Sequence, residues 1–331
     1  MKKILNDPQA YVEEMLEGLV LAHPQYYERA GDGRVIKRPG GPTPGKVGVV
    51  SGGGSGHLPV FTGYVGKGLL DACAIGEVFS SPSVDQMAEA MRAANGGAGV
   101  LRLYGNYGGD RMNFDMAGDM LDMEDVPSTT VLLTDDVASA PAAEAEKRRG
   151  VAGMVYAYKL AGAAAEAGAD LAEVTRVAQK AADAVRSIGA ALTACIVPQA
   201  GRPTFSIAED EMEMGMGIHG EPGVWKGKLR PADAIAGEML DHLLADLPVA
   251  RGDRVSVLVN SLGATPLEEL YILYRVVAAR LAGLGATIVM PLVGRYATSM
   301  EMAGVSFTLC KLDDELEKLL RAPADCAFWR V

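Results

Sequence analysis

Three apolar stretches of this chain each lead directly into a glycine-rich or acidic block. The stretches are 46–51, 99–104 and 129–134, followed by GGGSGH (52–57), NYGGD (106–110) and DD (135–136). Uninterrupted apolar strands that alternate with helical stretches are typical of a largely parallel sheet covered by helices on both faces. Ligands of such sheets gather at the C-terminal ends of the strands. The sequence therefore predicts an α/β fold with reactive side chains along one edge of a sheet.

The length of 331 residues exceeds what a single core usually serves, so two domains are expected. Ala, Glu, Lys and Leu dominate residues 142–186, with a break near 168–170, and the pattern changes at 187–189. Further helices are expected at 8–22, 231–247 and 267–284, and further strands at 190–197, 254–260, 287–292 and 306–311. We predict two mixed α/β domains, 1–186 and 187–331, each a largely parallel sheet with helices on its faces.

Charge and composition exclude several classes of protein. The net charge of −11 repels phosphate backbones and argues against nucleic acid as the main partner. No apolar run approaches the roughly 18 to 20 residues that span a bilayer, and residues 1–8 lack the apolar core of a secretory signal. The four cysteines are far apart, which predicts buried reduced thiols rather than disulfides or a zinc site. We expect a cytoplasmic protein that does not enter a membrane.

Three side chains inside glycine-rich blocks can handle protons or attack a carbonyl group. His57 closes the first block, Asp110 closes the second, and His219 lies in a third, GIHGEPG at 217–223. The chain has only four histidines, so two of them in such blocks indicate a reaction site. A neutral imidazole can attack a carbonyl carbon, and a carboxylate can accept a proton from a hydroxyl. Taken singly, each residue could also serve only as a turn or cap residue.

Neither of the glycine patterns that resemble nucleotide-binding loops fits one. A P-loop requires Lys and then Ser or Thr after its last glycine, whereas Gly56 is followed by His57. Residues 215–220 match G-x-G-x-x-G by letter, but an acidic, Met-rich segment precedes them and Pro222 prevents a clean helix start after them. A dinucleotide-dependent oxidoreductase is therefore disfavoured and would require measurable dinucleotide binding.

Two other patterns have plain structural interpretations. Asp135 and Asp136 resemble a metal-binding pair, but no His or further carboxylate lies at ligand spacing nearby, and we expect them to serve in a turn or helix cap. The Met-rich stretches 112–123 and 212–216 are expected to pack in the core.

Taken together, the blocks resemble the substrate-binding K subunit of bacterial dihydroxyacetone kinases, which is also the first domain of single-chain forms. The likeness runs from residue 6 to the end of the chain. The motifs that carry it are NDP (6–8), GGGSGH (52–57), NYGGD (106–110), RGVA (149–152), EMGMGIHGEPG (213–223) and LGATPL (262–267).

The resemblance implies an unusual chemistry, in which His219 adds to the ketone carbon of a short sugar and holds it as a covalent hemiaminal. His57 and Asp110 would help to deprotonate the terminal hydroxyl that attacks phosphorus. Substrate contacts are implied for Gly54, Ser55, Gly56 and His57.

The same resemblance places the phosphoryl donor on another protein. A separate, all-helical L subunit would carry a nucleotide with magnesium, so no cofactor or metal is expected on this chain. Whether the donor is a nucleoside triphosphate or a phosphotransfer relay is left open. A homodimer is also implied. Alone, the chain is expected to bind substrate without phosphorylating it.

Two positions depart from the family pattern. Leu58 stands where most members have Glu, and Gly105, which we still place in the substrate site, stands where a substrate-contacting Lys precedes Asn-Tyr. Losing a carboxylate and a cation removes hydrogen bonds to a triose and opens volume. The hypothesis that follows is a different short ketose, such as a tetrulose or a branched ketose, in place of dihydroxyacetone.

A non-enzymatic role is the alternative. The family contains paralogues that capture a ketone only to signal to a transcription regulator. The presence of His57 and Asp110 beside His219 favours catalysis, because a sensor needs the covalent trap and has no use for a base.

Overall fold

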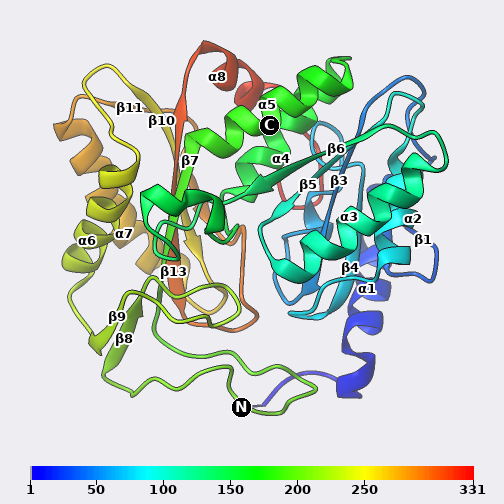
Figure 1. Ribbon diagram of the computed structural model, residues 1–331. Coiled ribbons are helices and arrows are strands. Elements are labelled where there is room, and N and C mark those ends of the chain that lie inside the picture. Colours follow the sequence, from blue (N-terminus) through cyan, green and yellow to red (C-terminus); the bar gives the residue numbers. More distant parts are fainter. Residues whose placement is uncertain (1) are drawn as a thin grey trace.

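The computed structural model describes residues 2–331 and contains two β-sheets with helices around and between them (Figure 1). The first sheet has the strand order β1-β2-β4-β3-β5-β6. Its strands are β1 (Glu28–Ala30), β2 (Val35–Lys37), β3 (Gly48–Ser55), β4 (Ala72–Val78), β5 (Val100–Gly105) and β6 (Ser128–Leu133). Strands β4, β3, β5 and β6 run parallel, and β1 and β2 form an antiparallel edge. The predicted parallel sheet is confirmed for this half.

The second sheet has the order β11-β10-β13-β7-β8-β9, and β12 also pairs with β10. Its strands are β7 (Val185–Ala191), β8 (Glu211–Met214), β9 (Trp225–Lys228), β10 (Arg254–Ser261), β11 (Thr287–Ile288), β12 (Leu292–Gly294) and β13 (Gly304–Leu312). Only β11 and β12 are parallel to β10, and the other pairs are antiparallel. The prediction of a second largely parallel sheet is therefore wrong. A buried apolar strand carries no direction in its own sequence, and β13 returns beside β10 through 295–303 without a crossover helix.

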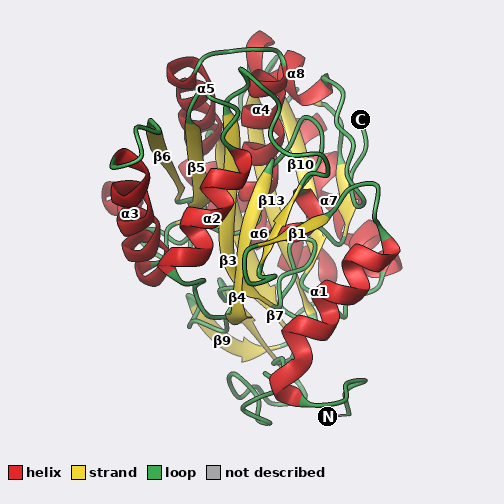
Figure 2. Ribbon diagram, turned by 90° about the vertical axis from the view of Figure 1, so that its right-hand side faces the viewer, coloured by secondary structure: helices red, strands yellow, loops and turns green. Residues whose placement is uncertain are grey.

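Helices cover both sheets and fill the space between them (Figure 2). They are α1 (Tyr11–Ala22), α2 (Val84–Ala94), α3 (Gly108–Asp122), α4 (Met154–Glu166), α5 (Leu171–Ala184), α6 (Ala232–Asp246), α7 (Leu267–Gly283) and α8 (Asp314–Arg321). Helices α2 and α3 pack on one face of the first sheet, whereas α6 and α7 pack on the second sheet. No helix within residues 2–331 is both long and apolar enough to cross a membrane.

The two sheets share one large core. Helix α4 is buried on all sides, and its Tyr156 belongs to the same apolar cluster as Val49 on β3 and Leu258 on β10. The mixed α/β fold with two sheets is confirmed, while the division at 186/187 stays a prediction. That boundary falls inside β7, the first strand of the second sheet.

The helices predicted over 142–186 correspond to α4 and α5, and Asp170 caps α5 at the predicted break. The first part of that stretch, Ala142–Lys147, is instead a 3-10 helix. The side chain of Arg148 is 2 % exposed and forms a two-pronged ion pair with Asp246 on α6, which holds this stretch against the second half of the chain. The strand expected at 190–197 overlaps β7 only at residues 190–191, because β7 begins at Val185, where α5 passes into it without a loop, and ends at Ala191.

Candidate active site

The three predicted reaction residues meet at one place. His57 follows β3, Asp110 lies in the first turn of α3 directly after β5, and His219 lies in the loop between β8 and β9. The ring centroids of His57 and His219 are 4.8 Å apart. Asp110 is close enough that His219 lowers the pKa of its carboxyl, although other effects outweigh this. Each sheet therefore supplies part of the site, as expected for side chains that gather at strand ends.

His57 is a neutral hydrogen-bond acceptor in this site. It is 1 % exposed, its ring stacks on Phe79 at 4.9 Å between centroids, and its Nδ1 donates to the carbonyl oxygen of Thr298 at 2.7 Å. Burial, followed by the nearby His219, lowers the pKa of His57 to about 3. Because Nδ1 carries the proton, Nε2 has a lone pair directed at no partner.

Asp110 has the properties of a general base. Burial raises the pKa of its carboxyl to about 6, with opposing contributions from Ser81 and His219. One of its oxygens, Oδ1, is buried without a hydrogen-bond partner. A carboxylate that titrates close to neutral pH is suited to accept a proton during a reaction.

His219 is held by Glu221, two residues further along the chain. Its Nδ1 donates to Glu221 Oε1 at 2.8 Å, and its backbone amide donates to Oε2 at 3.0 Å. The side chain is 24 % exposed, so a ligand can reach it, and in the neutral imidazole the proton on Nδ1 leaves the lone pair on Nε2. The motif GIHGEPG contains Glu221, but no role was predicted for this residue. An acid two residues after a histidine, inside a glycine loop, was the signal for this pairing.

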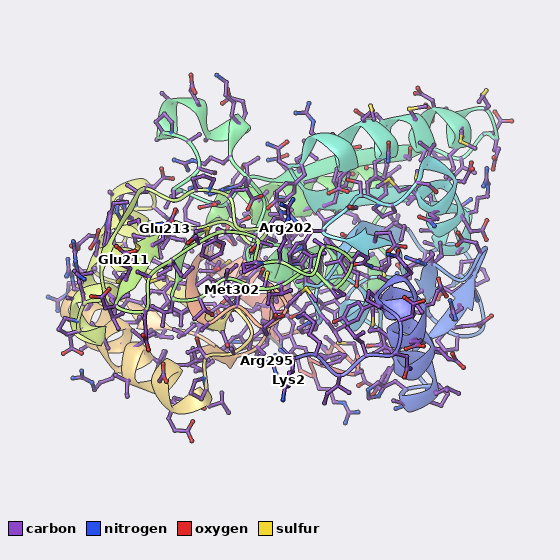
Figure 3. All side chains as sticks on the ribbon, turned by 90° about the horizontal axis from the view of Figure 1, so that it is seen from below. Lys2, Arg202, Glu211, Glu213, Arg295 and Met302 are labelled. Carbon is purple, nitrogen blue, oxygen red and sulfur yellow. The ribbon has the colours of Figure 1, made fainter. Side chains whose placement is uncertain are left out.

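The loop that carries His219 is fixed at its base. Its ends join β8 and β9, which pair antiparallel. The carboxylate of Glu213, which Figure 3 shows on the underside of the molecule, accepts a hydrogen bond of 2.8 Å from the amide of Gly223. The amide of Gly217 donates to the carbonyl oxygen of Glu221 at 3.0 Å. These bonds hold His219 toward His57.

Unpaired polar atoms concentrate at this site. Within residues 2–331, seven buried side-chain nitrogen and oxygen atoms lack a hydrogen-bond partner, and three of them belong to His57, Asp110 and Tyr107. The ring of Tyr107 packs edge-on against His219 at 4.8 Å, so it is a site residue that the sequence analysis missed. Buried polar atoms are normally paired. A cluster without partners therefore indicates a polar ligand.

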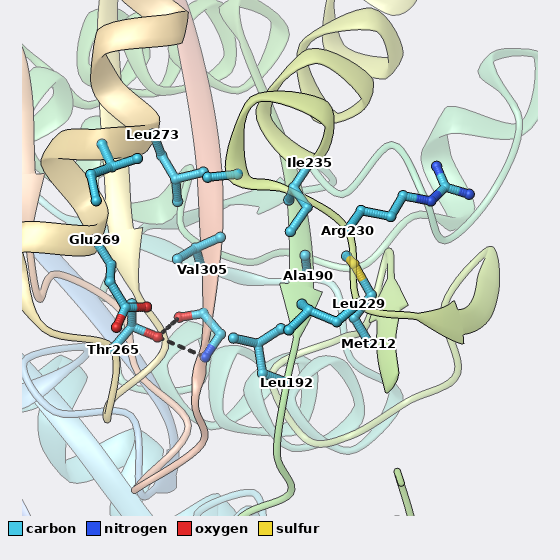
Figure 4. A pocket seen from close by; sticks show the side chains of 13 residues that line it. Ala190, Leu192, Met212, Leu229, Arg230, Ile235, Thr265, Glu269, Leu273 and Val305 are labelled. Atoms are coloured by element: carbon cyan, nitrogen blue, oxygen red, sulfur yellow. Dashed lines mark hydrogen bonds between the residues drawn. The ribbon is translucent and has the colours of Figure 1, made fainter. Parts of the chain in front are cut away.

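An apolar hollow between α6 and α7 lacks the unpaired polar atoms that characterise this site (Figure 4). It encloses about 190 Å³ and is lined mostly by aliphatic side chains, including those of Leu192 and Ile235. The hydroxyl of Thr265 on its wall is already bonded to both the amide and the carbonyl of Gly304. The hollow therefore presents no comparable set of unpaired polar atoms.

The first glycine block was predicted to follow the strand at 46–51, but most of it is the end of that strand. Strand β3 continues through Ser55, and only Gly56, at φ +103°, leaves the extended conformation. A Cβ on Gly53 would overlap the ring of Phe61, and one on Gly54 would lie 2.6 Å from the amide nitrogen of Ser80. These glycines let the strand end approach other protein segments closely.

Alanine at position 54 is therefore expected to destabilise the fold by about 1–3 kcal/mol, because the clash is with backbone atoms of Phe79 and Ser80 that cannot move aside. Gly237→Ala in α6 is the matched control. Nothing lies within 4 Å of its Cβ, so it should stabilise the protein by about 0.5–1 kcal/mol. Urea unfolding curves of both variants measure this difference, and equal stabilities would contradict the packing argument.

Part of the block and the residue that follows it line a separate, open cavity. Ser55, Gly56 and Leu58 contribute to a cavity of about 540 Å³ that Tyr11 and Phe328 also line. Leu58, one of the two departures from the family pattern, thus presents an aliphatic surface to this cavity. The substrate contacts expected of Gly54, Ser55 and Gly56 stay predictions.

Gly105, the second departure, is the last residue of β5. A Cβ on it would lie 3.2 Å from the carbonyl oxygen of Gly150 and 3.2 Å from the ring of Tyr107. Protein atoms therefore lie directly against this position. Its predicted contact with substrate remains untested.

Asp135 and Asp136 serve the segment before α4. Asp135 accepts hydrogen bonds from the amides of Val151 and Gly153, and Asp136 forms an ion pair with Arg149 at 2.8 Å. The side chain of Asp136 also accepts a hydrogen bond of 3.1 Å from the amide of Ala138, which is the turn role expected of it, whereas the bonds of Asp135 reach a distant segment. No group of three His, Cys, Asp or Glu side chains within residues 2–331 is arranged to hold a metal ion.

The predictions for the sulfur-containing residues have mixed outcomes. All four cysteines are buried and free, as predicted. Met212 and Met214 on β8 are fully buried, which confirms the core assignment there. The assignment is wrong for Met112, Met116 and Met123, which are exposed on and just after α3. These three lie on the outer side of an amphipathic helix whose inner side is formed by residues such as Phe114.

Fold and site together define a class: an α/β protein with a preformed site for a small polar molecule, built by residues from both halves. The comparisons with known proteins agree with this class. The chain belongs to the Dak1 domain family, whose model matches residues 17–328.

Relatives span the whole chain. The chain is 46 % identical over 99 % of its length to a dihydroxyacetone-binding subunit of a PTS-dependent dihydroxyacetone kinase from Listeria innocua, and covers 100 % of it. It is 46 % identical over 98 % of its length to D-erythrulose kinase from Mycolicibacterium smegmatis, of which it covers 56 %.

Solved structures show the same fold. The match to the dihydroxyacetone kinase of C. freundii covers 99 % of this chain and 60 % of the kinase chain. The two are 33 % identical, with a TM-score of 0.89. A co-activator of a dihydroxyacetone kinase operon matches 94 % of this chain and 96 % of its own at 33 % identity, with a TM-score of 0.87.

Proposed function

We propose that this chain is the substrate-binding subunit of a short-chain ketose kinase. In this role it captures the ketone as a hemiaminal on His219 and presents a terminal hydroxyl to a donor on another subunit. One observation carries the proposal: His57 Nε2 and Asp110 Oδ1 are buried without partners, and the imidazole of His219, with Nδ1 bonded to Glu221, lies 4.8 Å from the ring of His57. The Dak1 family and the kinase relatives support it.

Capture proceeds by addition of an imidazole to a ketone. The Nε2 lone pair of His219 forms a bond to the carbonyl carbon, and the π pair of the C=O bond moves to oxygen. That oxygen gains a proton and the imidazole loses one from Nδ1, so the adduct is a neutral hemiaminal with no net change in protons. Alcohols such as glycerol have no carbonyl carbon and are not trapped.

Phosphoryl transfer then uses the base on the first sheet. The terminal hydroxyl oxygen of the ketose bonds to phosphorus, its proton passes to Asp110, and the bond between phosphorus and the donor oxygen breaks with its electrons. His57, which is too weakly basic at a pKa of about 3 to hold that proton, orients the hydroxyl as an acceptor. Holding the reactants in place contributes roughly 7 to 11 kcal/mol to lowering the barrier.

The partners belong to this proposal as well. A separate L subunit supplies the phosphoryl group and carries nucleotide and magnesium, and a homodimer of this chain forms the working unit. The Listeria relative, a binding subunit of a PTS-dependent kinase, supports a multi-subunit enzyme. The cytoplasmic location stays a prediction.

A tetrulose is the proposed substrate. The support is the similarity to an erythrulose kinase, together with Leu58 and Gly105, which replace the carboxylate and the cation of the family pattern. With a matching L subunit and phosphoryl donor, the chain is expected to phosphorylate erythrulose at a higher kcat/KM than dihydroxyacetone. A coupled assay of both ketoses measures this, and strong preference for dihydroxyacetone would reject the tetrulose assignment.

The same assay separates the kinase subunit from its alternative. The co-activator structure shares this fold, so a ketose-sensing role deserves a direct comparison. Ketose capture without turnover, in the presence of an L subunit and donor that are active with another K subunit, would favour the sensor. The raised pKa of Asp110 favours the kinase, because it gives the site a base that a sensor does not need.

A further inference from the structure

A chain of charged groups runs from His219 into the interior of the protein. Glu221 binds His219 through both carboxylate oxygens, as described above. Behind Glu221 lies Arg149, whose Nη1 is 3.9 Å from Glu221 Oε2. The guanidinium of Arg149 also pairs with Asp136, through Nε at 2.9 Å and Nη2 at 2.8 Å. Asp136 is 2 % exposed, so the last of these charged side chains lies in the core of the protein.

The backbone of the loop is shaped to admit this arrangement. A Cβ on Gly217 would overlap Glu221 Oε2 and would lie 2.6 Å from Arg149 Nη1. Arg149 Nη2 additionally donates to the carbonyl oxygen of Gly215 at 3.3 Å. Glycine at position 217 therefore lets the carboxylate and the guanidinium lie directly beneath the loop that carries His219.

We propose that Glu221, supported by Arg149 and Asp136, is the positioning residue that makes His219 a nucleophile. It fixes the proton of the imidazole on Nδ1, which leaves the Nε2 lone pair directed at the ligand. The part of this inference that concerns ketose capture rests on the proposed function. The part that concerns the tautomer of His219 does not.

The carboxylate also compensates charge as the adduct forms. When Nε2 bonds to carbon, the ring becomes an imidazolium until Nδ1 releases its proton. Glu221 Oε1 already accepts the Nδ1 proton, so it stabilises this cation and can receive the proton. Although burial opposes ionisation, the hydrogen bond from His219 and the charge of Arg149 lower the pKa of Glu221. Glu221 is therefore ionised throughout the neutral range.

Two substitutions separate the two roles. Glu221→Ala removes the acceptor, so His219 should no longer be fixed in the Nδ1–H form. Glu221→Gln keeps an acceptor oxygen but no charge, so the tautomer should persist while ketose affinity falls. Hydrogen bonds to charged groups have strengths that correspond to a loss of about 10- to 100-fold in affinity. Glu209→Gln, an exposed acid on the approach to β8, is the matched control and should change neither property.

The measurement is ¹⁵N NMR of the histidine ring nitrogens in the full-length protein without ketose. The expected result is a protonated Nδ1 and a bare Nε2 for His219 in the wild type and in Glu221→Gln, and loss of that pattern in Glu221→Ala. An unchanged tautomer in Glu221→Ala would overturn the positioning role. Arg149→Lys, which keeps a cation beside Asp136, provides a second test if Glu221→Ala does not fold, and should lower ketose affinity in the same direction.

Capture is measured separately, by titrating the same samples with erythrulose and with dihydroxyacetone and following adduct formation by native mass spectrometry. If the wild type shows the expected tautomer but takes up neither ketose, the proposed function fails while the positioning role stands. If the wild type captures a ketose and Glu221→Gln does so with unchanged affinity, the charge-compensating role is rejected while the proposed function stands.

Discussion

Replacing His219 by alanine is expected to abolish covalent capture of ketoses by this chain. His57 cannot take over, although its Nε2 is also bare, because a nitrogen with a pKa of about 3 is a poor electron donor and has no carboxylate behind it. His219 is more exposed and is bonded to Glu221, which offsets the charge that develops on attack. Native mass spectrometry with excess erythrulose should show a one-to-one adduct for the wild type and none for His219→Ala.

The matched control is His242→Ala, which removes a half-buried histidine on α6. That variant should form the adduct as the wild type does. His57→Ala should also retain capture, with slower phosphorylation. Adduct formation that survives in His219→Ala, or that disappears in His57→Ala while the protein stays folded, would move the nucleophile away from position 219 and contradict the proposed chemistry.

Most of the fold followed from patterns along the chain. The strand predicted at 254–260 is β10, and the helix predicted at 267–284 is α7, each within one residue at either end. The elements that were not predicted are those that form only through pairing with segments distant in the sequence. Strand β4 was not predicted, because a short apolar run that contains a glycine resembles a turn in the sequence. Its pairing with β2 and β3, which are distant in the sequence, makes it a strand.

The site was predictable to the extent that glycines framed its reactive residues. His57, Asp110 and His219 were identified from their blocks, and the structure brings them together. Tyr107 and Glu221 were missed, because a tyrosine or a glutamate in a loop has many ordinary uses. What distinguishes these two residues is that each contacts His219 in the folded protein. Such a contact cannot be read from the sequence.

Strand direction was the other property that the sequence did not reveal. Both sheets have central strands that are buried on both faces, such as β3 and β10. In the first sheet, helices connect β4, β5 and β6 in succession and keep them parallel. In the second, the long excursion of 192–210 and the hairpin of β8 and β9 reverse the chain. That hairpin is what carries His219 back toward the first sheet.

Replacing Asp110 by asparagine is expected to leave ketose capture intact and to slow phosphorylation by a factor of about 10² to 10⁴, the usual contribution of a general base. Asparagine matches the shape of aspartate but cannot accept the hydroxyl proton. In the wild type, the rate should rise with pH up to about 6, as the carboxyl ionises, and then level off. The rate of Asp110→Asn should lack this rise. Single-turnover assays of pre-formed adduct with an L subunit measure both effects.

The same substitution should stabilise the fold, which separates a catalytic role from a structural one. The folded state raises the pKa of Asp110 from 3.8 to about 6, so ionising this group disfavours folding once the pH exceeds 3.8. The penalty is complete above pH 6 and corresponds to about 3 kcal/mol. Asp110→Asn should therefore resist urea better than the wild type at pH 8, and the difference should shrink as the pH falls through 6 toward 4. If Asp110 served to stabilise the fold, Asp110→Asn would instead be less resistant to urea than the wild type.

Asp119→Asn is the control for both measurements, because Asp119 is exposed on the same helix, α3. It should change neither the rate nor the stability appreciably. An Asp110→Asn variant that is more stable but phosphorylates at the wild-type rate would remove the base from the mechanism and leave covalent capture as the activity of the site, as in a sensor. A variant that is slower and more stable would show that the chain sacrifices stability to keep a base beside the captured ketose.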